Sequence, residues 1–257
     1  MQIDAFIVEA YLQGREDYNS HWLFSNITGD GEYAFDKPDP AYREKIGRVF
    51  KATQDALRNF KPYNPEIFSA LFSSWRKLAE GVNIILSVGC PAPYDAMVRE
   101  YEGREYIIFD LIRLLACQPD EGRFVSFLRQ MLTHEVSHIC IHADYPVMAS
   151  AGYQERLGEI VFNEGFAHAL AVLDGIGVYD FSSMIREHYR ASLQKLKEAL
   201  AETDPEKQKE YLRASNCGSY WDKFAAISGK LYILSHLDSI YEIYRGGPSQ
   251  LLSDMLG

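Results

Sequence analysis

The segment His134-Glu135-Val136-Ser137-His138 restricts the possible folds of this chain more than any other. Residues four apart in an α-helix lie on one face, one turn above each other. A helix over this segment therefore brings the His134 and His138 imidazoles together, where both can bind one metal ion. Glu135 stands beside them and can accept a proton from a water on that metal. The segment thus predicts a helix that carries part of a metal site.

The residues around this segment indicate a long helix with one buried face. Apolar side chains recur at spacings of three and four from Phe124 to Ile139, which is the pattern of such a helix. Glu121 stands where a helix N-terminus favours an acid. Pro146 lies where the helix must stop. We therefore expect a helix over residues 121–143.

A zinc ion in a hydrolytic site takes three protein ligands and keeps a further position for water. The best candidate for the third ligand is Glu164, on a second helix that we expect over residues 153–173. If the two helices run antiparallel, Glu164 faces the two histidines, and His168, one turn further on, can orient a ligand. The sequence therefore predicts one Zn²⁺ held by His134, His138 and Glu164.

Three other residues compete for the third position. Asp144 stands where metzincin-like enzymes have their third ligand, but that pattern needs a glycine where this chain has Ile141. His142 extends the row of the two histidines along the same helix. Three histidines on one straight row cannot reach one tetrahedral ion, because each turn advances about 5.4 Å. Glu159 is a further alternative on the second helix.

The two motifs together resemble the gluzincins, the thermolysin-like zinc peptidases whose third ligand is a Glu on the next helix. The form Asn163-Glu164-Gly165-Phe166-Ala167 is also similar to an uncharacterised bacterial family of predicted zinc-dependent proteases. The likeness covers residues 121–173. It implies three ligands and one general base, namely His134, His138, Glu164 and Glu135. Thermolysin-type enzymes carry an Asp four residues after the ligand Glu, whereas this chain has His168.

The resemblance also implies a small sheet ahead of the first helix, with an edge strand that holds an extended peptide. Residues 82–88 and 104–111 are rich in β-branched and aliphatic side chains, which is typical of strands. Turn-forming residues stand between them. An antiparallel edge here can bind a peptide main chain by strand addition. A purely structural sheet explains the same residues equally well.

Most of the remaining chain predicts helices. Their amphipathic or charged patterns cover residues 41–60, 65–80, 182–202 and 219–245. Gly29-Asp30-Gly31 predicts a turn. We expect an α+β fold that is mainly helical and zincin-like, with a small antiparallel sheet packed on the active-site helix. Residues 1–150 form the expected N-terminal lobe and residues 151–257 a helical C-terminal lobe, or both belong to one continuous domain.

Hydrolysis of an amide also needs a hydrogen-bond donor to the oxyanion that forms during the reaction. Tyr220 stands at the start of an expected helix, and His236 lies on the same helix. The position of Tyr220 after the second motif is similar to that of the catalytic Tyr or His in several gluzincins. Tyr220 is therefore the candidate donor. A half-buried tyrosine that hydrogen-bonds to the backbone is the alternative interpretation.

Composition limits the partners and the compartment. The net charge of −10 argues against binding to a phosphate backbone, so we expect no nucleic-acid partner. No apolar run is long enough to span a membrane, and the N-terminus carries Asp4 and Glu9 in place of the basic region of a secretory signal. The four cysteines are dispersed, as in a cytoplasmic protein with reduced thiols.

These features predict a zinc metallopeptidase that hydrolyses a peptide or protein substrate, with Glu135 as general base. A zinc-containing binding module without peptidase activity is the first alternative, and a fourth protein ligand such as Asp144 or Glu159 would favour it. A hydrolase of non-peptide amides is the second alternative. The sequence leaves the substrate, the cleavage preference and the oligomeric state open.

Overall fold

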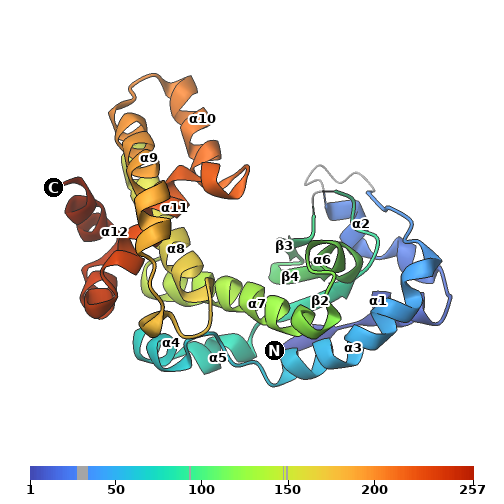
Figure 1. Cartoon of the computed structure of the whole chain (residues 1–257). Coiled ribbons are helices and arrows are strands. Elements are labelled where there is room, and N and C mark those ends of the chain that lie inside the picture. The colour runs from blue at the N-terminus through green and yellow to red at the C-terminus, as the bar shows by residue number, and fades with distance from the viewer. Residues whose placement is uncertain (28–33, 93, 147, 149) are drawn as a thin grey trace. The chain divides into compact units, whose positions relative to one another are not determined.

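The computed structural model describes residues 1–27, 34–92, 94–146, 148 and 150–257 (Figure 1). These residues group into two compact units: unit 1 contains residues 1–61 and 76–129, and unit 2 contains residues 62–75 and 130–257. The division lies inside helix α7 (Glu121–Asp144), whereas the predicted lobes divide at residue 150. The expected turn at Gly29-Asp30-Gly31 lies outside the described residues.

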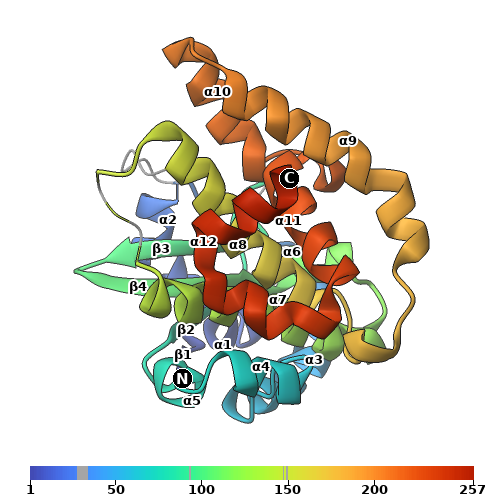
Figure 2. The same cartoon turned by 90° about the vertical axis from the view of Figure 1, so that its left-hand side faces the viewer.

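The described part of unit 1 contains a four-stranded mixed sheet in the order β1-β2-β4-β3. Its strands are β1 (Gln2–Asp4), β2 (Asn83–Ser87), β3 (Ala96–Tyr101) and β4 (Arg104–Asp110). Strand β2 pairs in parallel with both β1 and β4. Strand β3 pairs antiparallel with β4, and the two form the hairpin visible in Figure 2.

The expected antiparallel sheet is therefore wrong. Both predicted strands exist as β2 and β4, but they run parallel to each other. Strand β3 was not expected; it lies in the connection between them and takes the antiparallel place beside β4. Parallel neighbours need a long crossover connection, and the β3 segment supplies that length. Binding of a peptide at a sheet edge stays a prediction.

Helices complete unit 1. They are α1 (Phe6–Leu12), α2 (Trp22–Asn26), α3 (Arg43–Arg58), α6 (Leu111–Cys117), most of α5 (Trp75–Glu80) and the first part of α7. Helix α1 contacts β2 and α3, and α6 contacts β4. The helix expected over residues 41–60 is confirmed as α3.

Short 3₁₀ turns occur in both units. Those of unit 1 are Asp17–Ser20 and Pro40–Tyr42, and those of unit 2 are Ile176–Val178, Tyr220–Asp222 and Leu237–Ser239.

Unit 2 is helical throughout its described elements. Besides the second part of α7 it contains α4 (Pro65–Leu71), α8 (Tyr153–Ala171), α9 (Ser182–Ala201), α10 (Pro205–Asn216), α11 (Phe224–Ser235) and α12 (Ile240–Leu256). Helix α8 contacts α10, α11 and α12, and α11 also contacts α9. Every residue from Phe224 to Leu231 is buried. Helix α11 is therefore the central element of unit 2, because a helix buried on all sides must lie inside the core.

Three of the expected helices in unit 2 are confirmed with small changes. The helix predicted over residues 153–173 is α8, and that over residues 182–202 is α9. The pattern over residues 219–245 divides between α11 and the first part of α12. The pattern over residues 65–80 also divides, because the backbone leaves the helical conformation at Phe72 and separates α4 from α5. No helix in the described part of the chain is long and apolar enough to cross a membrane.

Two glycines let α8 and α11 approach closely. A Cβ atom added to Gly229 would lie 2.1 Å from the carbonyl oxygen of Val161, which is far inside van der Waals contact. A Cβ atom on Gly165 would lie 2.9 Å from the backbone of Gly229. The neighbouring atoms belong to the backbone, so no side chain can move aside. This contact holds the stretch of α8 that carries Glu164, the residue next to Gly165.

We expect Gly229→Ala to destabilise unit 2, because the added methyl group forces α8 and α11 apart. Overpacking of this kind costs about 1–3 kcal/mol of unfolding free energy, and a backbone clash belongs at the upper end. Urea unfolding followed by circular dichroism measures the loss. Gly177→Ala is the matched control, because no atom lies within 4 Å of its added Cβ. Equal stability of the Gly229→Ala protein and the parent would contradict the close approach.

The C-terminal end of α8 is held by the buried side chain of Asn64. Its amide nitrogen donates to the carbonyl oxygens of Leu170 and Leu173, at 2.9 Å each. Its amide oxygen accepts from the backbone N–H groups of Gly175 and Ile176, at 2.7 and 2.9 Å. These bonds satisfy carbonyl groups that a helix end leaves without a partner. Helix α8 is thus fixed at this end as well as at its glycine contact.

Candidate metal centre

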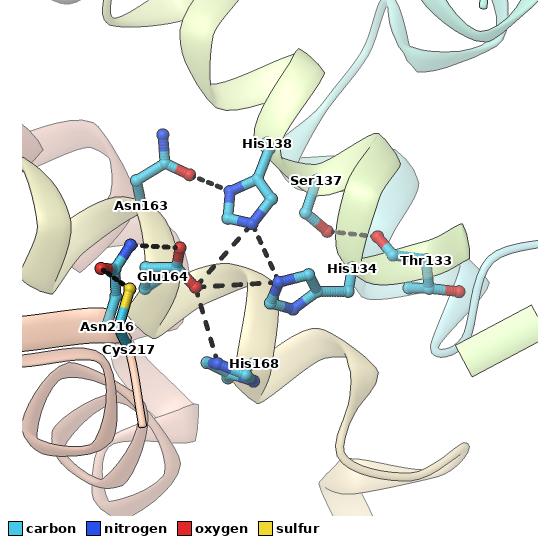
Figure 3. Close-up of polar contacts among 9 residues, drawn as sticks. All are labelled: Thr133, His134, Ser137, His138, Asn163, Glu164, His168, Asn216 and Cys217. Carbon is cyan, nitrogen blue, oxygen red and sulfur yellow. Dashed lines mark hydrogen bonds and ion pairs between the residues drawn. The ribbon is translucent and has the colours of Figure 1, made fainter. Parts of the chain in front are cut away.

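Helix α7 presents two of the predicted ligands on one face. The Nε2 atoms of His134 and His138 lie 2.9 Å apart (Figure 3), as the spacing of four residues predicts. The His134 side chain is 18% exposed and the His138 side chain 19%, so solvent reaches both rings. The helix expected over residues 121–143 is confirmed as α7.

Helix α8 brings Glu164 to the same point. Its Oε2 atom lies 3.7 Å from Nε2 of His134 and 3.9 Å from Nε2 of His138. One possible ligand atom from each of the three residues lies within 4.8 Å of the other two. Nitrogen ligands around a tetrahedral zinc ion are about 3.3 Å apart, since each lies about 2.0–2.1 Å from the metal. The observed separations bracket that spacing, so the three residues fit one ion.

Neighbouring groups orient both imidazoles. Nδ1 of His138 hydrogen-bonds to the amide oxygen of Asn163, and the ring of His134 hydrogen-bonds to the backbone of Ala167. An amide oxygen only accepts, so Nδ1 of His138 donates this bond, and the neutral tautomer with its proton on Nδ1 has its lone pair on Nε2. This lone pair faces a second imidazole and a carboxylate. Such a group of acceptors is stable around a cation, which is the second reason why a metal fits here.

Burial keeps two histidines of this region in the form that binds metals. It lowers the pKa of His134 well below its usual value, and the neighbouring His138 and His168 lower it further. Burial also lowers the pKa of His168 to about 3, with a contribution from the ammonium groups of Lys223 and Lys230. Metals bind the neutral imidazole. At neutral pH the His134 ring is therefore uncharged, and no proton competes with a metal ion for its nitrogen.

Glu164 is held from two sides. Nε2 of His168 lies 3.5 Å from its Oε2 atom, and the side-chain amide of Asn216 donates to its Oε1 atom at 3.3 Å (Figure 3). Asn216 ends helix α10. These contacts leave Oε2 directed toward the two histidines of α7. His168 thus lies where an orienting residue was expected.

Glu135 interacts electrostatically with His138 and Glu164, but it does not belong to the ligand group. Burial raises the pKa of its carboxyl group, the nearby His138 lowers it, and Glu164 raises it. A carboxylate with a raised pKa is a stronger base than one in water. The position and the environment of Glu135 are therefore compatible with proton transfer beside the three ligands.

The competing ligands have other contacts. Asp144 accepts a hydrogen bond of 2.7 Å from the hydroxyl group of Tyr244. The ring centre of His142 lies 6.4 Å from that of His138, one turn further along α7. Among the described residues, only His134, His138 and Glu164 form a group of three or more with the geometry of a metal site, and Glu159 is not in it.

The candidate donor Tyr220 contacts His168. Its ring meets the His168 ring edge-on, with the centres 5.6 Å apart. Its hydroxyl oxygen accepts a hydrogen bond of 2.7 Å from Nζ of Lys230. Partial burial raises the pKa of Tyr220 to about 12, although 40% of the residue is exposed; the phenol stays protonated at neutral pH and can donate. The second candidate, His236, bonds to Ser235 and to the carbonyl of Tyr232.

Sequence reasoning missed three supporting residues. Asn163 stands inside the second motif, but a position beside Glu164 does not reveal a bond to a histidine of another helix. Asn216 and Lys230 come from α10 and α11, more than fifty residues from Glu164 along the chain. Only the packing of these helices on α8 brings them to the centre.

The comparisons with known proteins find no match for this chain. No model of a known protein family matches this chain, and neither curated proteins nor solved structures give a match. The resemblance to gluzincins therefore rests on the two motifs. Fold and site together define an α+β protein, mainly helical, whose described residues include a His-His-Glu group that could hold a metal ion.

Proposed function

We propose that this chain is a zinc-dependent hydrolase of the gluzincin type that cleaves peptide bonds. The convergence of His134, His138 and Glu164 from α7 and α8 is the observation that supports this most. A catalytic zinc site has three protein ligands and solvent access. The described group has three members, and its side chains are 18–19% exposed, so both requirements are met.

Zinc, when bound, lowers the pKa of a water molecule from about 15.7 toward about 7 and polarises a substrate carbonyl group. Glu135 accepts the proton of the attacking water and passes it to the leaving amine. Its raised pKa supports this role, because a stronger base takes the proton more readily. Asn163 and His168 keep His138 and Glu164 oriented.

Tyr220 donates its hydroxyl proton in a hydrogen bond to the oxyanion that forms at the substrate carbonyl. Preorganised donors of this kind stabilise the transition state, and the loss of one costs about 10²–10³ in turnover. The pKa of about 12 supports this role, because the hydroxyl group keeps its proton over the whole working range of an enzyme.

A second candidate function is a zinc-containing binding module without peptidase activity. Its support is His168, whose ring centre lies 4.5 Å from that of His134 and whose Nε2 lies 3.5 Å from Glu164. A fourth ligand would close the coordination sphere and exclude water. The metal-bound protein separates the two functions, since X-ray absorption spectra count histidine ligands. Two histidines support the hydrolase, and three support the module.

Elemental analysis and a peptide-library digest test the proposed function directly. We expect about one zinc per chain, cleavage of library peptides, loss of cleavage with a chelator, and recovery when zinc returns. Zinc without cleavage of any peptide would favour the binding module or a hydrolase of non-peptide amides. A protein that binds no zinc would rule out all three.

The proposed substrate is a peptide or protein, and the proposed compartment is the cytoplasm. The four cysteines support this compartment, because all are free thiols and reduced thiols are typical of the cytosol.

A further inference from the structure

Lys230 is a buried lysine in the centre of α11. Only 1% of its surface is exposed, and among the described residues no carboxylate forms an ion pair with it. Burial of an ammonium group without a counter-ion is costly, and it lowers the pKa of Lys230 to about 8. A methionine would fill a similar volume without this cost. The charge of Lys230 therefore needs an explanation other than packing.

The ammonium group contacts two aromatic residues of the 3₁₀ turn that precedes α11, Tyr220 and Trp221. Nζ donates to the hydroxyl oxygen of Tyr220 at 2.7 Å. It also lies 5.2 Å from the ring centre of Tyr220 and 5.7 Å from that of Trp221, within the range of cation–π attraction. Trp221 in turn stacks on His188, with ring centres 3.6 Å apart. Lys230 thus fixes the segment that carries Tyr220.

The hydrogen bond also determines which way the tyrosine proton points. An ammonium group has donors and no acceptor, so the phenol oxygen must accept from Lys230. The O–H of Tyr220 is then directed away from Lys230 and is available to another acceptor. A bond accepted from a cation also strengthens the bond that the same hydroxyl donates. The ring of Tyr220 contacts His168 edge-on, and His168 contacts Glu164, so one residue, His168, connects Tyr220 to the ligand group.

We propose that Lys230 is a positioning residue, which holds Tyr220 so that its hydroxyl group donates toward the centre formed by His134, His138 and Glu164. The inference rests on the proposed hydrolase function and adds a residue to it. Lys230 also lowers the pKa of His168 through its charge, but its proposed effect on turnover is exerted through Tyr220.

Substitution of Lys230 and Tyr220, singly and together, tests the proposal in the zinc-loaded full-length protein. With a library peptide that the parent cleaves, Lys230→Met is expected to lower kcat about tenfold or more with KM unchanged, because an oxyanion donor acts in the transition state. In the Tyr220→Phe background the same change should have no further effect. Lys223→Met is the matched control, since Lys223 also acts on His134 and His168 through its charge. An equal loss in both backgrounds would overturn the proposal.

Two measurements need no substrate. Thermal unfolding of the metal-free proteins should give a Tm for Lys230→Met at or above that of the parent, because a buried charge is removed. A packing role would lower it. In protein with ¹³Cζ-labelled tyrosine, the Tyr220 resonance, assigned with Tyr220→Phe, should shift in Lys230→Met and stay in place in Lys223→Met. An unshifted resonance overturns the proposal, while a zinc-loaded parent protein that cleaves no peptide would overturn only the hydrolase function on which the proposal rests.

Discussion

Glu135→Gln is expected to lower turnover by about two to four orders of magnitude, the contribution of a general base. The amide has nearly the shape of the carboxylate but cannot take up the proton of the attacking water. Glu135 does not belong to the ligand group, so the zinc content should equal that of the parent. Peptide hydrolysis and elemental analysis of the same preparation measure both quantities.

Glu159→Gln is the matched control for this change. Glu159 also has a carboxyl group whose pKa is raised by burial, and it lies on α8, outside the ligand group. We expect the Glu159→Gln protein to cleave at the parent rate. Turnover of the Glu135→Gln protein at the parent rate would end the assignment of Glu135 as base.

His138→Ala is expected to abolish tight zinc binding. The change removes one of three ligands and leaves the Asn163 amide oxygen without its partner. Bound zinc stabilises the folded parent by about 4 kcal/mol when free zinc is a thousand times the dissociation constant. We therefore expect zinc to raise the Tm of the parent and to leave that of the variant unchanged, as differential scanning calorimetry measures.

His142→Ala is the control for His138→Ala. His142 lies on the same helix, and its ring centre is 6.4 Å from that of His138, but it is outside the ligand group. Zinc should raise the Tm of this variant as it does that of the parent. If zinc instead stabilises the His138→Ala protein fully, the metal is bound elsewhere, and the assignment of ligands is wrong.

The helical elements were largely predictable, because the spacing of apolar residues is a local property of the chain. Helices α3, α7, α8 and α9 follow their patterns closely. The sheet was predictable only in part. Apolar runs indicated β2 and β4, but strand direction depends on partners that are distant in sequence, and the pairing of β2 with β1 involves residues about eighty positions apart.

The candidate metal centre, like the sheet, was predictable from the sequence only in part. The spacing of four residues determined by itself that His134 and His138 share one face of a helix, because the α-helical repeat acts within a single turn. It also placed Glu135 beside them.

Tertiary structure alone decided which carboxylate joins the two histidines. Glu164, Asp144 and Glu159 are all available in the sequence; the motifs favoured Glu164, but only helix packing shows which carboxylate lies beside the histidines. The close contact of α8 with α11 at Gly165 and Gly229 fixes the position of α8 and therefore of Glu164. Asp144 instead accepts a hydrogen bond from Tyr244. Contacts between helices depend on the shape and volume of side chains far apart in the chain, and that information does not appear in the spacing of any single motif.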